Sequence, residues 1–254
     1  MTLVALLMGF LASASFADFV HPGVLHSKES LAFTKEKIAA EEEPWISLWR
    51  SLRKSVYSDR DWRAEPRTHV ERGPYNQPNI GSSEFTRDSK AAYTFALISV
   101  LTDEGETASK RYADKAAGII DAWADELESI SNHDAALLVG MNGQAYIAAA
   151  EILKYTESGW PEVRQKRFER MIREIWLPII YDFYPTANGN WDAAMLQTMI
   201  AMGVFLDDEK LFERATNYFL EGKGNGAVRN YFKPSGVCQA VSYTHLTLPT
   251  IYSV

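Results

Sequence analysis

The sequence predicts an all-α fold, an incomplete (α/α) toroid of antiparallel helical hairpins. Between residues 27 and 220, apolar residues recur at the spacing of one helix face, and the connections between these segments are short. No segment ahead of the last few residues alternates at period two long enough to predict a strand. An α-solenoid of the tetratricopeptide kind is the alternative, and it is less favoured because the sequence contains no repeat of constant length.

The first two helices are expected at residues 28–40 and 44–56. Ser27 is a suitable N-cap for the first helix, and Pro44 suits the first turn of the second. The following stretch, residues 57–83, contains Pro, Gly and Asn but no apolar periodicity, so it is expected to be a long loop. Long ordered loops in compact domains are often functional.

The remaining helices are expected at residues 84–102, 107–127, 134–155, 161–183, 191–205 and 208–220. Gly159 and Pro161 mark one of the connections, and Asp207 is the expected cap of the last helix. Short connections between long amphipathic helices favour antiparallel neighbours. A curved stack of helical hairpins is therefore the expected architecture.

The chain has 254 residues, of which 46% are apolar, and a formal net charge of −7. This composition is typical of a globular protein with a substantial core. The acidic balance argues against a general affinity for nucleic acid, and a polyanionic partner would need a local basic groove. The single cysteine, Cys238, excludes an internal disulfide, and the five scattered His show no metal-ligand spacing. We expect no metal and no cofactor.

Residues 1–17 have the pattern of a secretory signal peptide. An apolar run from Leu3 to Leu11 leads into small residues, and a small-x-small site ends at Ala17, although a basic n-region is missing. The run is too short for a membrane-spanning helix. We expect secretion, to the periplasm if the source is bacterial, and no membrane contact after cleavage. A buried N-terminal helix is the alternative.

Residues 241–254 differ in composition from the rest of the chain. They contain no Asp, Glu, Lys or Arg and are rich in Thr and β-branched residues. The stretch resembles translated sequencing-adaptor read-through, so we interpret it as a non-native tail, with a genuine C-terminal strand as the alternative. On this interpretation residues 18–240 are the N-terminal part of a toroid domain, and the chain is a fragment.

Polar and aromatic residues gather at the expected helix mouths, where the loops at one rim of a toroid would surround a cleft. These candidate site residues are Arg87, Asn142, Asn190, Trp191, Asp192, Arg229 and Tyr231. Structural alternatives stay open for each of them. Asn190 or Asp192 can simply cap a helix, and Arg87 can form an ion pair with Asp88 or Glu84.

Three stretches resemble the alginate lyase family of secreted α/α-toroid polysaccharide lyases. They are SSEFTRDSKAAYTFALISVLTDEGETASKRYADKAAGIIDAWAD, AAEILKY and NGNWDAAMLQTMIAMGVFLDDEKLFERATNYFLEGKGNGAV, and the similarity covers most of residues 20–239. The Asn190–Trp191 pair, which follows a glycine and opens a helix, resembles the asparagine–tryptophan site of other toroid lyases that act on uronate polymers. Family members continue past YFKPSGVCQ into a segment with further Arg and His residues, which is replaced here.

The resemblance implies β-elimination next to a uronic acid in an alginate-like polymer. The proton at C5 is weakly acidic, so the neighbouring carboxylate must be neutralised by donors aimed at it. Asn190 is expected to do this because an amide donates hydrogen bonds without acting as a base. Arg87 is the expected ligand of a substrate carboxylate, Trp191 is expected to pack on a sugar face, and Asp192 to orient the amide or cap the helix.

The family's base and acid are usually a Tyr and a His. Tyr231 is the candidate base, His133 is interpreted as a helix cap, and the missing group is expected beyond residue 239. Asn142 and Arg229 are further candidates for substrate binding. The expected partner is an acidic polysaccharide, bound by a monomer. Two alternatives remain: an α/α-toroid glycoside hydrolase that uses Asp192 and a second carboxylate, and a non-catalytic carbohydrate-binding protein.

Overall fold

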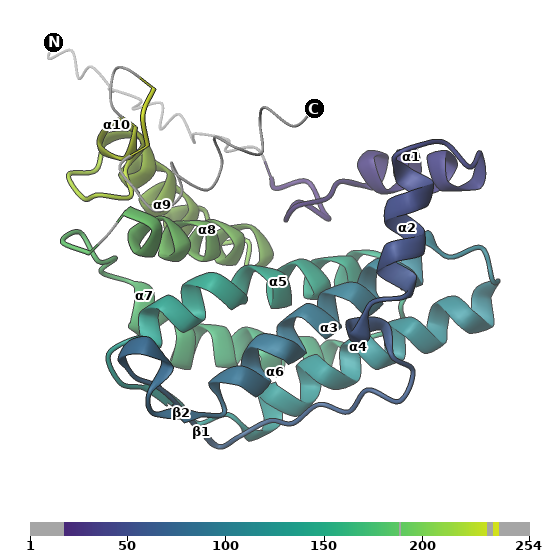
Figure 1. Ribbon diagram of the computed structural model, residues 1–254, viewed down its shortest axis with the longest axis horizontal. Helices are drawn as coiled ribbons and strands as arrows, with labels where there is room; N and C mark the ends of the chain where they lie inside the picture. The colour runs from purple at the N-terminus through teal and green to yellow at the C-terminus, as the bar shows by residue number, and fades with distance from the viewer. Residues whose placement is uncertain (1–17, 188, 233–235, 239–254) are drawn as a thin grey trace, which may run out of the picture.

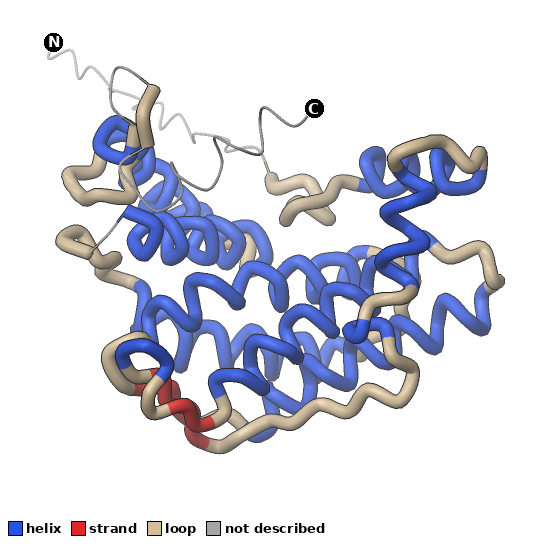
Figure 2. Tube along the Cα trace, in the orientation of Figure 1, coloured by secondary structure: helices blue, strands red, loops and turns tan. Residues whose placement is uncertain are grey.

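The computed structural model describes residues 18–187, 189–232 and 236–238, and these residues form an all-α fold, as predicted. Helices make up the body of the protein, and a small sheet lies at one end of it (Figures 1 and 2). The predicted signal peptide, residues 1–17, and the predicted tail, residues 241–254, lie outside the described residues.

The first helical hairpin consists of α1 (Lys28–Ala39) and α2 (Trp45–Arg53), and it lies at one end of the body (Figure 1). Ser27 caps α1, as predicted. Its Oγ accepts a hydrogen bond from the Ser30 N–H at 3.1 Å, and the Ser30 Oγ accepts one from the Ser27 N–H at 2.9 Å. This reciprocal capping box satisfies two of the backbone donors that a helix start leaves open.

The second hairpin consists of α3 (Ser82–Leu101) and α4 (Glu106–Glu126), which pack against each other across a short turn. The central helix, α5 (Ala135–Tyr155), packs on α3 and on α8 (Gly189–Phe205). α9 (Glu209–Glu221) packs on α8 and completes the third hairpin (Figure 1). Consecutive helices therefore pair in these three hairpins, as predicted.

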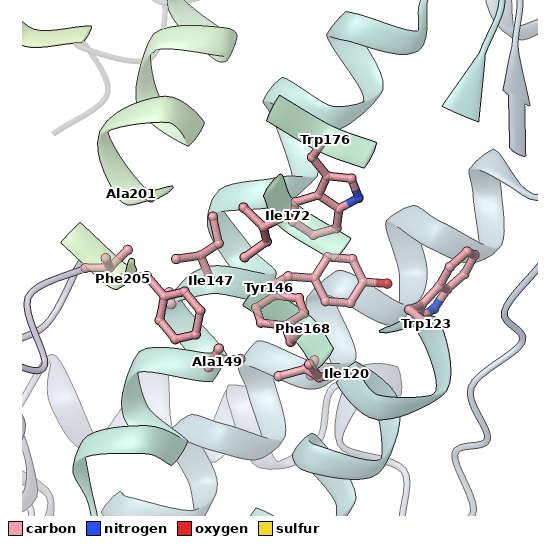
Figure 3. Packing of buried hydrophobic residues seen from close by; sticks show 14 of the residues in the cluster. Ile120, Trp123, Tyr146, Ile147, Ala149, Phe168, Ile172, Trp176, Ala201 and Phe205 are labelled. Atoms are coloured by element: carbon pink, nitrogen blue, oxygen red, sulfur yellow. The ribbon is translucent and has the colours of Figure 1, made fainter. Parts of the chain in front are cut away.

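α5 is the core helix of the fold. By length and composition it could cross a membrane, but 78% of its most apolar window is buried inside the protein. Around it, Tyr146, Phe168 and Trp176 are fully buried, and the Trp176 ring contacts the rings of the other two (Figure 3). The fully buried Phe85 joins this cluster, with its ring centroid 5.1 Å from that of Tyr146. Burial of such large aromatic rings is a major source of stability in a single core.

α5 and α8 approach closely because α5 has two glycines on the facing side. A Cβ at Gly140 would lie 2.8 Å from the Ala194 backbone, and one at Gly143 would lie 2.6 Å from the Thr198 side chain. The buried Thr198 Oγ1 donates to the Gly140 carbonyl at 2.8 Å and accepts from the Gln144 N–H at 3.1 Å. In a regular α-helix the Gln144 N–H would instead donate directly to the Gly140 carbonyl, four residues earlier.

The helix predicted at residues 161–183 is present but changes register. α6 (Glu162–Met171) passes into a π-helical turn (Ile172–Trp176) and then into α7 (Leu177–Ile180). Pro178 explains the change, because proline lacks an N–H and its ring clashes with the carbonyl four residues earlier in a regular α-helix. A wider turn ahead of the proline avoids that clash.

The expectation of no strand before residue 241 is wrong for three short segments. β1 (His69–Arg72) pairs in parallel with β3 (Ser129–Ser131) and antiparallel with β2 (Asn79–Ile80). Strands this short do not show a period-two pattern, so the sequence carries no signal for them. The sheet ties the long loop ahead of α3 to the connection between α4 and α5 (Figure 2).

The long loop is also anchored by Asp88 of α3, which is almost fully buried. Its carboxylate accepts hydrogen bonds from the indole N–H groups of Trp62, at 3.0 Å, and Trp123, at 2.8 Å. It also accepts one from the Glu65 backbone N–H at 2.9 Å. Burial raises the pKa of the Asp88 carboxyl. Asp88 therefore holds the loop and is not the partner of Arg87.

The turn into α9 differs from the prediction by one residue. Asp208, not Asp207, caps α9, since its Oδ1 accepts a hydrogen bond from the Leu211 N–H at 3.1 Å. Asp207 has a left-handed backbone, with φ +51°, and its carboxylate lies 3.0 Å from the His21 Nε2. The other ring nitrogen of His21 lies 3.1 Å from the fully buried Glu151 carboxylate, so this imidazole fastens the N-terminal segment to the core.

Candidate functional site

The first turn of α8 carries Asn190, and the residue before it, Gly189, lies against Tyr231. Tyr231 belongs to α10 (Val228–Tyr231), and its ring lies against Gly189, where an added Cβ would be 2.2 Å from the ring Cδ2. Asn190 is half-buried. Among the described residues, nothing forms a hydrogen bond with its side-chain amide, so the amide donors of Asn190 remain available to a ligand.

Asp192 is fully buried beneath this turn. Its Oδ1 accepts a hydrogen bond from the Tyr184 N–H at 3.0 Å, and its Oδ2 accepts from the Tyr218 hydroxyl at 2.9 Å and the Gly226 N–H at 2.8 Å. Burial, together with the hydrogen bond to this carboxylate, raises the pKa of Tyr218, which keeps the phenol a donor. Asp192 thus positions the start of α8, and its carboxylate does not face a substrate.

The glycine-rich loop after α9 packs closely against Asp192 and Ala193 at the start of α8. A Cβ at Gly226 would lie 2.7 Å from the Ala193 backbone nitrogen, and one at Gly224 would lie 2.7 Å from the Asp192 Oδ2. Only residues without a side chain allow the loop to approach the helix this closely. The loop then leads directly into α10 and places Tyr231 beside the start of α8.

Trp191 lies between two other rings. Its ring is stacked on that of Tyr184, with centroids 6.0 Å apart, and is in edge contact with that of His133, with centroids 5.7 Å apart. His133 is not a helix cap: Asp134 occupies the N-cap position of α5. The His133 Nδ1 lies 2.7 Å from the Asp134 Oδ1, and the His133 side chain is 55% exposed.

A cleft of about 440 Å³ lies between the start of α3, the first half of α5 and the end of β1. Three cationic residues line it, namely Arg72, Arg87 and Lys90, together with the amide of Asn142. The cleft therefore contains the two predicted binding residues that α3 and α5 contribute. It provides the local basic groove that a chain of net charge −7 would need to bind a polyanion.

The contacts of these residues leave room for a ligand. Arg87 is paired only loosely with Glu65, at 3.3 Å, and both side chains are about half exposed, so this pair adds little to stability. Asn142 is almost fully buried at the cleft floor, where its Nδ2 donates to the Leu138 carbonyl at 2.8 Å. Its Oδ1 accepts a long hydrogen bond from the Ser89 hydroxyl at 3.4 Å.

Asp134 connects the cleft to the aromatic rings at α8. Its Oδ1 faces His133, and its Oδ2 lies 3.9 Å from the Arg72 Nε. The Asp134 backbone N–H also donates to the Arg72 carbonyl at 2.9 Å, which fixes the end of β1 against the start of α5. One buried carboxylate thus holds a cation of the cleft and the imidazole next to Trp191.

Comparison with protein families gives one match, the family described as Alginate lyase, over residues 35–232. This chain belongs to the alginate lyase family. The match lies within the predicted domain, residues 18–240, and includes both the cleft and the start of α8. Neither the curated proteins nor the solved structures include a protein that matches the chain significantly.

Membership of the alginate lyase family supports a polysaccharide lyase function in general. Not every predicted residue lies at the cleft. Arg229 forms a two-point ion pair with Glu221 of α9, with both N–O distances 2.7 Å, and is not among the residues that line the cleft. Both side chains are well exposed. The geometry gives no support to substrate binding by Arg229.

Two cations of the cleft, Arg72 and Lys90, are not predicted from the sequence, and neither are the ring contacts of Trp191 with His133 and Tyr184. Arg72 belongs to the long loop, whose length was the available signal. Lys90, His133 and Tyr184 are ordinary surface types in sequence, and only the fold places Lys90 in the cleft and the other two against Trp191. Within the described parts of the chain, no group of three or more His, Cys, Asp or Glu side chains could hold a metal ion.

Proposed function

We propose that this member of the alginate lyase family binds a uronate-containing, alginate-like polysaccharide in the cationic cleft and cleaves it by β-elimination. The observation that carries the proposal is the grouping of Arg72, Arg87 and Lys90 in one cleft of an acidic protein. A polymer with a carboxylate on every sugar would be attracted to such a cleft, and guanidinium groups bind carboxylates in two-point geometry.

In the proposed reaction, Asn190 neutralises the carboxylate next to the breaking bond. Its amide donors stabilise the charge that develops as the C5 proton leaves. Tyr231, beside Gly189, is the proposed base that takes this proton. Trp191 contributes a ring against which the apolar face of a sugar can pack.

The hydrolase alternative requires Asp192 as a catalytic carboxylate, and the structure does not favour this role. A glycosidase acid or base must contact the glycosidic oxygen or the attacking water. Asp192 is fully buried, and its two oxygens already accept three hydrogen bonds from the protein. The lyase proposal does not require an accessible Asp192 carboxylate, because it assigns Asp192 only a positioning role.

The localisation, oligomeric state and partners of the protein are also proposed. We propose a secreted monomer, periplasmic in a bacterium, with an acidic polysaccharide as partner and with neither nucleic acid nor membrane as a ligand. The helical hairpins α3–α4 and α8–α9, with α5 between them, are consistent with part of an (α/α) toroid. The formal net charge of −7 does not favour a nucleic acid.

The test is product analysis with alginate and with a neutral glucan as the control polymer. β-Elimination creates an unsaturated uronate that absorbs ultraviolet light, whereas hydrolysis creates only new reducing ends. We expect ultraviolet-absorbing products from alginate and none from the glucan. Reducing ends without ultraviolet absorbance, or binding without any product, would overturn the proposal in favour of the hydrolase or the binding protein.

A further inference from the structure

Met141 is an exposed methionine on the core helix, α5. It is 54% exposed and lines the cationic cleft together with its neighbour in the chain, Asn142. The other methionines within the described parts of the chain are almost fully buried; they are Met171, Met195, Met199 and Met202. An oxidant in solution must contact the sulfur that it oxidises, so it reaches Met141 in preference to these four.

The Met141 sulfur contacts a cation of the cleft. The Arg72 Nη1 donates to the Met141 Sδ over 3.9 Å, a weak hydrogen bond because a thioether sulfur is a poor acceptor. The Arg72 Nε faces the Asp134 Oδ2, also at 3.9 Å. Both contacts are long, so the Arg72 Nη1 can exchange the sulfur for a substrate carboxylate, which is the stronger acceptor.

We propose that Met141 is a reversible oxidation site that controls binding of the polyanion in the cleft; this rests on the proposed function. Oxidation converts the apolar thioether into a polar sulfoxide, whose oxygen is an acceptor. Because the sulfur already contacts the Arg72 Nη1, the sulfoxide oxygen accepts the hydrogen bond that a substrate carboxylate would otherwise accept. Arg87 and Lys90 then remain as the cations of the cleft that bind the polymer, and binding is weaker.

The modification is an oxygen transfer from a hydroperoxide. A lone pair of the Met141 sulfur attacks the terminal peroxide oxygen, the O–O bond breaks, and an S–O bond forms. The proton on the transferred oxygen passes to the leaving oxygen, which departs as water or as an alcohol. The sulfur loses two electrons, and the peroxide gains them. A methionine sulfoxide reductase, with a thiol as the electron donor, reverses the change.

The experiment treats the full chain with hydrogen peroxide and compares each variant with itself before and after treatment. Mass spectrometry of the digested protein locates the added oxygen, and the rate of ultraviolet-absorbing product gives KM and kcat for alginate. We expect Met141 to be oxidised before the buried methionines. The KM of the wild type should then rise about fivefold, the effect of losing one hydrogen bond to the substrate, with kcat nearly unchanged. Treatment with the reductase should restore KM.

Two variants assign the effect to one sulfur. Met141→Leu keeps an apolar side chain of similar volume that peroxide does not oxidise, so its KM should be the same before and after treatment. Met202→Leu, at a buried methionine outside the cleft, is the matched control and should keep the wild-type response. A rise that persists in Met141→Leu, no rise in the oxidised wild type, or earlier oxidation of a buried methionine would overturn the inference.

The untreated wild type tests the proposed function independently. If it forms no unsaturated product from alginate, the lyase function is overturned. The inference is then decided by the Kd of the same polymer, which needs no turnover. A Kd that rises on oxidation of Met141 supports the inference, and an unchanged Kd or the absence of binding overturns it.

Discussion

The hydroxyl of Tyr218 donates a hydrogen bond to the Asp192 Oδ2 over 2.9 Å, joining the end of α9 to the start of α8 beneath the site. The Gly226 N–H donates to the same oxygen at 2.8 Å, and the Tyr184 N–H donates to the other at 3.0 Å. Three chain segments thus meet at one buried carboxylate. The position of Asn190, two residues earlier, depends on this junction.

Asp192→Asn should therefore destabilise the protein although it preserves the shape of the side chain. The amide puts an N–H₂ group opposite a donor, and a buried donor without an acceptor costs about 1–3 kcal/mol. Tyr218→Phe removes one of the three donors and should cost less, about 1 kcal/mol. Urea unfolding of both variants checks the order. If Asp192→Asn were as stable as the wild type, the junction would not be structurally important.

Asn190→Ala should abolish turnover of alginate and leave folding nearly intact. Loss of one donor that stabilises developing charge lowers kcat about 10²–10³-fold, while loss of a helix cap would cost only about 1 kcal/mol. Asn217→Ala, on the exposed face of α9, is the matched control and should change neither quantity. The assay is the rate of ultraviolet-absorbing product, with thermal unfolding in parallel. Activity retained in Asn190→Ala would remove the central residue of the proposed mechanism.

The cationic cleft predicts salt-dependent binding. The double variant Arg87→Gln and Lys90→Gln removes two of the three cations and should raise KM for alginate about tenfold, which is about 1.4 kcal/mol of binding. Its KM should also respond less to added salt, because salt screens charges that the variant no longer has. Lys110→Gln with Arg111→Gln makes the same charge change on α4, outside the cleft. An equal rise of KM in that control would mean that net charge, and not the cleft, governs binding.

Much of the fold could be predicted because its signals are local. Ser27 caps α1 through neighbouring residues, and the helix boundaries follow the apolar periodicity that buries α3, α5 and α8. The failures involve contacts between distant segments. The strands β1 and β3 pair across about sixty residues, and Asp207 is drawn from the cap position toward His21 by tertiary contact.

The candidate site divides in the same way. Asn190 and Tyr231 are proposed from a resemblance, and their roles stay predictions; the structure places the Tyr231 ring against Gly189, the residue before Asn190. Asp192 and Arg229 could not be distinguished from ligands by sequence, because burial and the pairing with Glu221 are properties of the folded chain. His133 illustrates the converse case, since its position before α5 indicated a cap, while Asp134 and Trp191 give it a different environment.

Gly140→Ala should destabilise the contact between α5 and α8. The added methyl group would lie 2.8 Å from the Ala194 backbone, which cannot rotate away, and overpacking of this kind costs about 1–3 kcal/mol. Gly118→Ala, in α4, is the matched control because its Cβ would meet nothing within 4 Å. It should stabilise the protein by about 0.5–1 kcal/mol through helix propensity. Opposite signs in urea unfolding are the expected result; a stabilised Gly140→Ala would show that the two helices can separate freely.

His26 should make stability fall as the solution becomes acidic. Burial lowers the pKa of His26 below its ordinary value of 6.5, and burial raises the pKa of its hydrogen-bond partner, Tyr93, to about 12. Near neutral pH the Tyr93 hydroxyl therefore donates to an unprotonated His26 Nε2, and protonation of His26 is opposed by burial of the charged imidazolium.

The sign follows from proton binding. Between the lowered pKa of folded His26 and 6.5, the unfolded chain binds more protons than the folded one, so the free energy of unfolding rises with pH across that window. His26→Gln keeps an acceptor for Tyr93 but does not titrate, and it should flatten this part of the pH profile of urea unfolding. His69→Gln, at an exposed imidazole, should keep the wild-type slope. An unchanged slope in His26→Gln would assign the acid sensitivity to another group.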